Sequence, residues 1–123
     1  MTMFTEGKHA GGFLVWEVLR DFTRETITIA SGAGKLEPGT VLGKITTGGK
    51  YTALTPGATN GSQNAAGLLW ANVDATDADA PGVVILRGPA IANQHDLVWP
   101  DAATEAQITA ATSALAGLGI ILR

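Results

Sequence analysis

The chain contains no cysteine, only two histidines and little charge. Charged residues make up 15% of its 123 residues, against a usual share of ~25%. The lack of cysteine excludes disulfides and thiolate metal sites, and it leaves the redox compartment undefined. The low charge indicates a domain that is rich in small residues, or one that hides part of its surface in an assembly.

Clusters of positive charge are also missing. The formal net charge is −3, and residues 51–123 carry only two bases against six acids. Residues 1–50 are close to neutral, with six bases and five acids. Because a phosphate-binding surface needs clustered Lys and Arg, we expect no nucleic-acid partner.

Long apolar runs are absent as well. No run comes near the ~20 residues that are needed to span a bilayer. Residues 1–12 are polar and glycine-rich, which is unlike a signal peptide. We therefore expect a soluble protein that is made in the cytosol and has no membrane partner.

The sequence is instead rich in glycine, with 16 residues of this type, which indicates many tight turns. Its length favours a single domain. Short apolar or alternating segments between turns predict β-strands. These segments are residues 13–19, 26–29, 40–46, 50–54, 68–73, 83–88 and 118–122. Gly43 lies within one of them and predicts a bend or bulge, whereas Gly48 and Gly49 predict a hairpin turn.

One helix is predicted, at about residues 104–116. Thr104 and Gln107 have the spacing of a capping box, and Gly117 is well placed to end the helix. Apolar residues recur at helical spacing between them: Ile108, Ala111 and Leu115. The fold class is therefore mainly β, with one short C-terminal helix.

The N-terminal region differs from the rest of the chain. Residues 1–12 have no periodicity and predict an extended arm, whereas residues 13–19 are apolar at nearly every position. A continuous apolar run indicates a strand that is covered on both faces. We divide the chain into an arm at residues 1–24 and a β-rich domain at residues 25–123. The alternative is that residues 13–19 form a core strand of the body.

The three tryptophans have two possible roles. We interpret Trp70 and Trp99 as core residues and Trp16 as an interface residue, although Trp is enriched at interfaces generally. Pro100 follows Trp99 and is expected to stop the preceding strand.

Motifs for catalysis or cofactor binding are incomplete. Residues 31–35 end like a phosphate loop, but Ile29 stands where the first Gly belongs and Leu36 where Ser or Thr belongs. The aspartates of residues 74–79 alternate as in a calcium loop that lacks its Gly and closing Glu. The histidines show no metal-ligand spacing. We therefore expect no enzyme, no cofactor and no metal site.

Three stretches resemble the head decoration proteins of lambda-like tailed phages: residues 6–45, 66–71 and 97–103. They keep the order of that family and extend over almost the whole chain. The most specific of them is Leu97-Val98-Trp99-Pro100-Asp101-Ala102-Ala103, which leads into the predicted helix.

The resemblance implies a compact β-clip-like body, a homotrimer, and no catalysis or cofactor. It implies binding to the major capsid protein at three-fold positions on the outside of an icosahedral shell, which is reinforced against the pressure of packaged DNA. Such a protein is made in the host cytoplasm and ends on the virion surface. The capsid-contact candidates are Phe4, His9, Phe13, Leu14, Val15, Trp16 and Val18, and the interface or core candidates are Trp70, Trp99 and Pro100.

An extended arm could add a strand to a sheet edge of the capsid protein. Phe13, Val15 and Leu19 would then face one partner, and the opposite face would carry Leu14, Trp16 and Val18.

Two other functions stay open. Residues 38–45 are also similar to a hairpin of biotinyl or lipoyl carrier domains. However, Lys44 lies within a strand pattern, and Lys50 lacks the small flanking residues of a modified lysine. A small hydrolase of unknown specificity is the other alternative, although no nucleophile and base are paired in the sequence.

Overall fold

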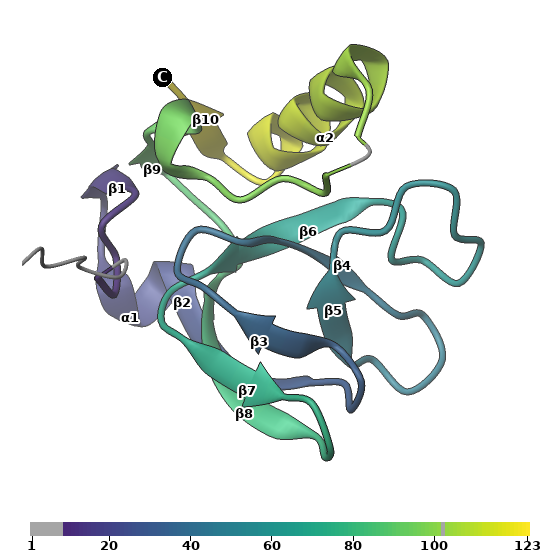
Figure 1. The fold of residues 1–123 in the computed structure, drawn as a ribbon. Helices are drawn as coiled ribbons and strands as arrows, with labels where there is room; N and C mark the ends of the chain where they lie inside the picture. The colour runs from purple at the N-terminus through teal and green to yellow at the C-terminus, as the bar shows by residue number, and fades with distance from the viewer. Residues whose placement is uncertain (1–8, 102) are drawn as a thin grey trace, which may run out of the picture.

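The structure, a computed structural model, describes residues 9–101 and 103–123 (Figure 1). The strands are β1 (Leu14–Glu17), β2 (Arg24–Ile29), β3 (Gly34–Leu36), β4 (Val41–Lys44), β5 (Tyr51–Ala53), β6 (Ala65–Leu69), β7 (Val73–Ala75), β8 (Ala80–Ile85), β9 (Ala90–Ala92) and β10 (Ile120–Leu122). The helices are α1 (Arg20–Thr23), the 3-10 helix η1 (Gln94–Asp96) and α2 (Glu105–Gly117). The predicted fold class, mainly β in one domain with a short C-terminal helix, is confirmed.

A closed barrel forms the body, with the strand order β2-β5-β4-β6-β8. The longest pairing is antiparallel and runs along all of β2, from Arg24 opposite Ile85 to Ile29 opposite Ala80. β4 and β5 form the predicted hairpin, and both Gly48 and Gly49 have positive φ angles in its turn. A short parallel bridge between β2 and β5 closes the barrel.

Three barrel strands, β4, β6 and β8, bury residues on both faces, which explains their apolar runs. Successive side chains of a strand point to opposite faces, so adjacent residues enter two different cores. The adjacent pairs are Val41 and Leu42 in β4, Leu68 and Leu69 in β6, and Val84 and Ile85 in β8. One core fills the barrel, and the other lies between the barrel and α2, which packs over β6 (Figure 1).

A three-stranded sheet, with the order β1-β9-β10, lies beside the barrel. β1 is antiparallel to β9, whereas β10 is parallel to it. The inner face of this sheet carries Ala90, Ala92 and Ile120, all of which are buried in the core that contacts α2. A separate two-stranded sheet pairs β3 with β7.

Gly43 forms the predicted bulge, where the register between β4 and β6 shifts after Leu42. A Cβ atom at this position would lie 2.3 Å from the carbonyl oxygen of Ser62. This distance is shorter than a real carbon–oxygen contact, so the close approach of the two chain segments requires glycine here.

Several elements differ from the sequence-based expectation, and among them β3 and β9 were not predicted. The predicted strand 68–73 is two strands, β6 and β7, because the chain leaves the barrel at Trp70 and pairs with β3 from Val73 onward. Asp74, expected in an acidic loop, therefore lies in β7 opposite Lys35. Helix α1 was not predicted, since only one turn of four residues forms it.

The described part of the predicted arm packs against the body. β1 pairs with β9, the amide of Asn93 donates to the carbonyl of Phe13 at 2.8 Å, and Arg24 begins β2. Residues 1–8 lie outside the described residues. The use of the segment as a separate docking arm stays a prediction.

The capping box at the start of α2 gives a first test. The hydroxyl of Thr104 accepts a hydrogen bond from the backbone N–H of Gln107 at 3.2 Å, and the Gln107 side chain accepts one from the backbone N–H of Thr104 at 2.9 Å. Thr104→Ala removes the first bond and should lower the free energy of unfolding by about 1 kcal/mol in urea melts. Thr109→Ala, on the exposed part of the same helix, is the control and should not destabilise the protein. Equal stability of the wild type and Thr104→Ala would contradict the role of the cap.

Candidate functional site

The N-terminal segment is held on the barrel by the indole ring of Trp70, directly after β6. The guanidinium carbon of Arg24 lies 3.4 Å from the centre of this ring. The ring of Phe13 meets it edge-on, with the centroids 6.3 Å apart and the planes at 72°. The backbone N–H of Gly11 donates to the Trp70 carbonyl at 2.8 Å. Trp70 is thus a partly buried anchor, which agrees with its interpretation as a core residue.

Gly11 is required at this anchor for two reasons. Its φ angle is +67°, a backbone conformation that favours glycine. A Cβ atom would also lie 2.0 Å from a carbon of the Trp70 ring. The glycine at position 11 is therefore explained by the close packing of the backbone on the ring of Trp70.

The Arg24 side chain is also paired with Glu17 of β1. Its Nε donates to the Glu17 carboxylate at 3.2 Å, and a terminal nitrogen donates to the other carboxylate oxygen. The Thr23 hydroxyl donates to the same carboxylate at 2.6 Å. The side chains of Arg24 and Glu17 are only 20% and 11% exposed, so water screens the pair weakly. This pair connects β1 to β2.

The predicted contact residues of this segment separate into buried and exposed groups. Phe13 is 2% exposed and belongs to the core, so its place among the surface candidates is corrected. Leu14 is partly buried against the same core. Val15 and Val18 are 63% and 49% exposed. The expected division into two apolar faces fails at Phe13 and Leu14 because the pairing of β1 with β9 turns them inward.

Two further candidates lie at or before the start of this segment. His9 is exposed and lines a hollow with Phe13, Pro38 and Asp96. Phe4 lies outside the described residues.

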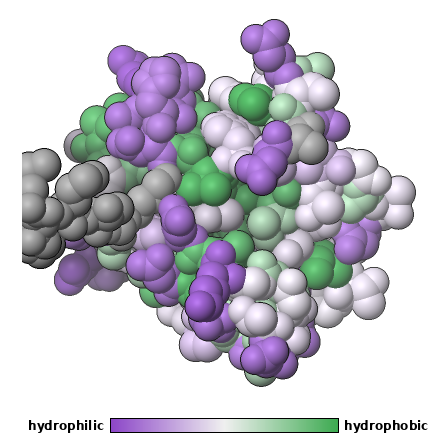
Figure 2. Space-filling view, viewed as in Figure 1, coloured by the Kyte–Doolittle hydropathy of each residue, from purple (hydrophilic) through white to green (hydrophobic). Residues whose placement is uncertain are grey.

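The outer face of the β1-β9-β10 sheet carries an apolar row. Trp16 of β1 pairs with Ile91 of β9, which in turn pairs with Ile121 of β10. Directly paired residues point to the same face, and here it is the face opposite the buried alanines of β9. Trp16 and Ile121 are 50% and 42% exposed. At the upper left of Figure 2, a hydrophilic cluster (purple) lies in front of hydrophobic residues (green).

Of these three residues, only Trp16 was expected from the sequence to lie at an interface. Ile91 and Ile121 lie in strands of three residues, which are too short to show a period-two pattern. Their partners are also distant in the sequence, so no local signal could place them beside Trp16.

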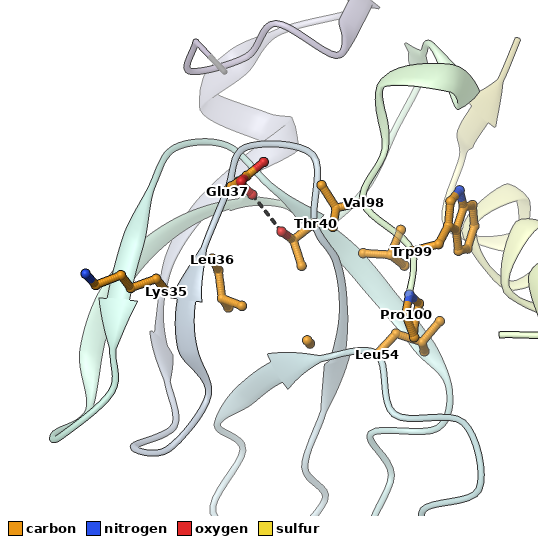
Figure 3. A pocket seen from close by; sticks show the side chains of 10 residues that line it. Lys35, Leu36, Glu37, Thr40, Leu54, Val98, Trp99 and Pro100 are labelled. Carbon is orange, nitrogen blue, oxygen red and sulfur yellow. Dashed lines mark hydrogen bonds between the residues drawn. The ribbon is translucent and has the colours of Figure 1, made fainter. Parts of the chain in front are cut away.

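Trp99 and Pro100 border a hollow of about 200 Å3 between β5, the turn before β4 and residues 98–100 (Figure 3). Its floor is apolar and includes Val41 and Leu54, which are 1% and 4% exposed. Residues 98–100 are held there by a parallel bridge between Thr40 and Val98. Trp99 packs partly against the core, as interpreted from the sequence.

A second ion pair joins Lys50, directly before β5, to Asp79, directly before β8. Asp79 accepts hydrogen bonds from Lys50 at 2.5 Å and from the backbone N–H of Ser31 at 2.8 Å. The hydrogen bond from Lys50, and then that from Ser31, lower the pKa of the Asp79 carboxyl. Lys50, a position weighed for a carrier lysine, is thus engaged in a structural pair.

Metal sites and membrane-spanning helices were also considered for the described part of the chain. No group of three or more His, Cys, Asp or Glu residues there could hold a metal ion. None of the described helices is long and apolar enough to cross a membrane.

A comparison with protein families gives one match that extends over nearly the whole chain. The model of the family described as bacteriophage lambda head decoration protein D matches residues 3–120. The chain belongs to this family. None of the curated proteins compared with the chain matches it. The predicted resemblance is confirmed.

Membership settles the class of the molecule. The family consists of structural phage head proteins, which decorate the capsid and are not known as enzymes. The decoration protein presents two apolar features to solvent, namely the outer face of the β1-β9-β10 sheet and the hollow beside Trp99.

The Arg24–Glu17 pair gives a test of how the decoration protein holds its N-terminal segment. Arg24→Met keeps an apolar contact with Trp70 but leaves the Glu17 carboxylate without its cation. The free energy of unfolding should fall by about 2 kcal/mol, since an unpaired buried charge is strongly unfavourable and this one is slightly exposed.

Glu17→Gln in the Arg24→Met background should recover part of this loss, because it removes the unpaired charge. Urea unfolding followed by tryptophan fluorescence measures the wild type and both variants. A double variant that is less stable than Arg24→Met would contradict the coupling.

Proposed function

We propose that the protein binds the outer surface of an icosahedral phage head at three-fold positions and stabilises the shell against the pressure of packaged DNA. It acts as a homotrimer, and its partner is the major capsid protein. It is made in the host cytoplasm and resides on the outside of the virion. The observation that carries this proposal is the family match over residues 3–120.

The structure supports a contact role for the N-terminal segment. Val15, Val18 and Leu19 are 63%, 49% and 58% exposed, which is unusual for three large apolar side chains within five residues. β1 also lies at one edge of its sheet. An edge strand with apolar side chains can accept or supply a further strand by backbone hydrogen bonding. The proposed capsid-docking segment therefore includes these residues, within the predicted arm 1–24.

A trimer would make such a contact effective. One segment presents a few side chains, and each Å2 of apolar surface that is removed from water contributes roughly 25 cal/mol. Three segments on one rigid body bind together, so the second and third contacts form at high effective concentration. A small apolar surface on each copy can thus hold the shell firmly.

Co-sedimentation with mature heads tests the proposal. Purified protein should bind heads that lack it and should raise the temperature at which those heads release DNA. Val18→Asp places a charge in the docking segment and should weaken binding at least about tenfold, as expected for an interface residue that is important for affinity.

Thr109→Asp, on the exposed part of α2, is the matched control and should bind like the wild type. A wild-type protein that remains in the supernatant with every head preparation would exclude the proposed function.

A further inference from the structure

Asn60 and Gly61, in the loop between β5 and β6, form a pair that is prone to spontaneous covalent chemistry. The backbone nitrogen of the following residue can attack an asparagine side chain, and glycine has no Cβ atom to hinder that attack. Asn60 is exposed to water, and Gly61 is partly exposed. This loop therefore carries a candidate site of modification that plays no part in the proposed contact with the capsid.

The fold itself requires glycine at position 61. Its φ angle is +106°, a conformation that residues with a side chain rarely adopt. A Cβ atom there would lie 2.4 Å from the hydroxyl oxygen of Thr46. The backbone N–H of Thr46 also donates to the carbonyl of Asn60 at 2.8 Å, which holds the loop against the chain just after β4. A bulkier residue is thus excluded after Asn60, so the reactivity of the pair must be limited by its other neighbours.

The reaction is a cyclisation followed by hydrolysis, and it changes no oxidation state. Hydroxide from water removes the proton on the Gly61 nitrogen, whose electron pair then forms a bond to Cγ of Asn60. The bond from Cγ to Nδ2 breaks, and the nitrogen leaves as ammonia with a proton from water, which regenerates hydroxide. Water then opens the resulting succinimide at either of its carbonyl carbons, which gives aspartate or isoaspartate.

Gln63 blocks the first bond of this reaction. The backbone N–H of Gly61 donates to Oε1 of Gln63 at 2.8 Å. In the succinimide, Cγ of Asn60 takes the place on the Gly61 nitrogen that the proton held. While the hydrogen bond lasts, that place is directed at Gln63, and the proton is shielded from hydroxide. Ring closure therefore requires this bond to break.

Ser62 holds the other reacting group. Its backbone N–H donates to Oδ1 of Asn60 at 3.1 Å, and its hydroxyl donates to the same oxygen at 2.6 Å. A turn of the Asn60 amide toward ring closure strains these bonds, and Ser62 is only 2% exposed, so its hydroxyl would lose a partner in a buried place. Donors at Oδ1 also polarise the amide and favour attack. Orientation decides the balance, because reacting groups that are misplaced by even ~1 Å react far more slowly.

We propose that Asn60–Gly61 is a latent site of succinimide formation, which Gln63 and Ser62 keep closed in the folded protein. Modification then occurs only when the loop opens locally and both side chains release the pair. Gln63 contributes one hydrogen bond and Ser62 two, and each favours the closed loop by a factor of roughly five. These contacts therefore set the rate at which the site is modified.

Modification prevents the loop from closing again. Isoaspartate lengthens the main chain at the point where the Asn60 carbonyl accepts its hydrogen bond from Thr46. The carbonyl oxygen of the adjacent Ser62 lies against Gly43 in the bulge of β4, where there is no space even for a Cβ atom. A lengthened loop therefore disturbs the pairing of β4 with β6.

Incubation of the full chain at mildly alkaline pH, followed by mass spectrometry, tests the proposal. Deamidation of Asn60 should be at least about tenfold slower in the folded chain than in the chain unfolded by guanidinium chloride. Gln63→Ala should raise the rate in the folded chain by roughly fivefold, since one hydrogen bond is lost. Ser62→Ala should raise it as well, and Gln63→Ala carries the test if Ser62→Ala does not fold.

Thr59→Ala is the matched control, because Thr59 is exposed and adjoins the pair on its other side. This variant should react like the wild type, and thermal melts establish which variants are folded. In guanidinium chloride all of the variants should react at one rate, since the contacts of Gln63 and Ser62 no longer exist.

Asn93 is a control within the chain, because its Oδ1 also accepts a backbone N–H, from His95 at 3.0 Å, but Gln94 follows it instead of glycine. In the unfolded chain, Asn60 should react well before Asn93. Equal rates for Asn60 in the folded and the unfolded wild type would overturn the proposal. An Asn60 that stays intact in the unfolded chain, or a folded Gln63→Ala variant that reacts no faster than the wild type, would also overturn it.

Discussion

The stacking of Arg24 on Trp70, together with the pairing of Arg24 with Glu17, is the constraint on which the arrangement of the N-terminal segment depends. The guanidinium lies 3.4 Å from the centre of the indole ring and is shared with a carboxylate that is only 11% exposed. Gly11 and Phe13 also pack on this ring. β1 is thereby fixed on the barrel, so its exposed side chains are displayed in a defined orientation instead of on a loose strand.

Two cores share the barrel wall, and this explains the low charge of the sequence. In β4, β6 and β8, consecutive residues point into different cores, so no face of these strands remains for polar side chains. α2 closes the second core against β6 through Ala111 and Leu115. Part of the low charge is thus explained by burial within a single chain. The large apolar residues that remain exposed lie within residues 15–22 and at Leu118 and Ile121.

Local signals in the sequence predicted most of the elements, but not α1, β3 or β9 and not the pairing of the strands. The capping box at Thr104 and the hairpin at Gly48 depend on residues that are close along the chain, and both are confirmed. Trp70 was interpreted as a core residue and is partly buried against the core, although its stacking with Arg24 was not foreseen. Phe13 was misplaced because a continuous apolar run does not reveal which of its members turn inward. That choice is made by β9, more than 70 positions further along the chain, as the pairing of Leu14 with Ala92 shows.

The strands of the β1-β9-β10 sheet are far apart in the sequence, so this sheet can form only late in synthesis. β1 emerges first from the ribosome but has no strand partner until β9 is made, and the parallel strand β10 joins only when residue 122 has followed. Closing so long a loop is slow compared with forming the β4–β5 hairpin. The row of Trp16, Ile91 and Ile121 therefore does not exist on a nascent chain. Any contact that uses this face therefore begins only after residue 122 has been made.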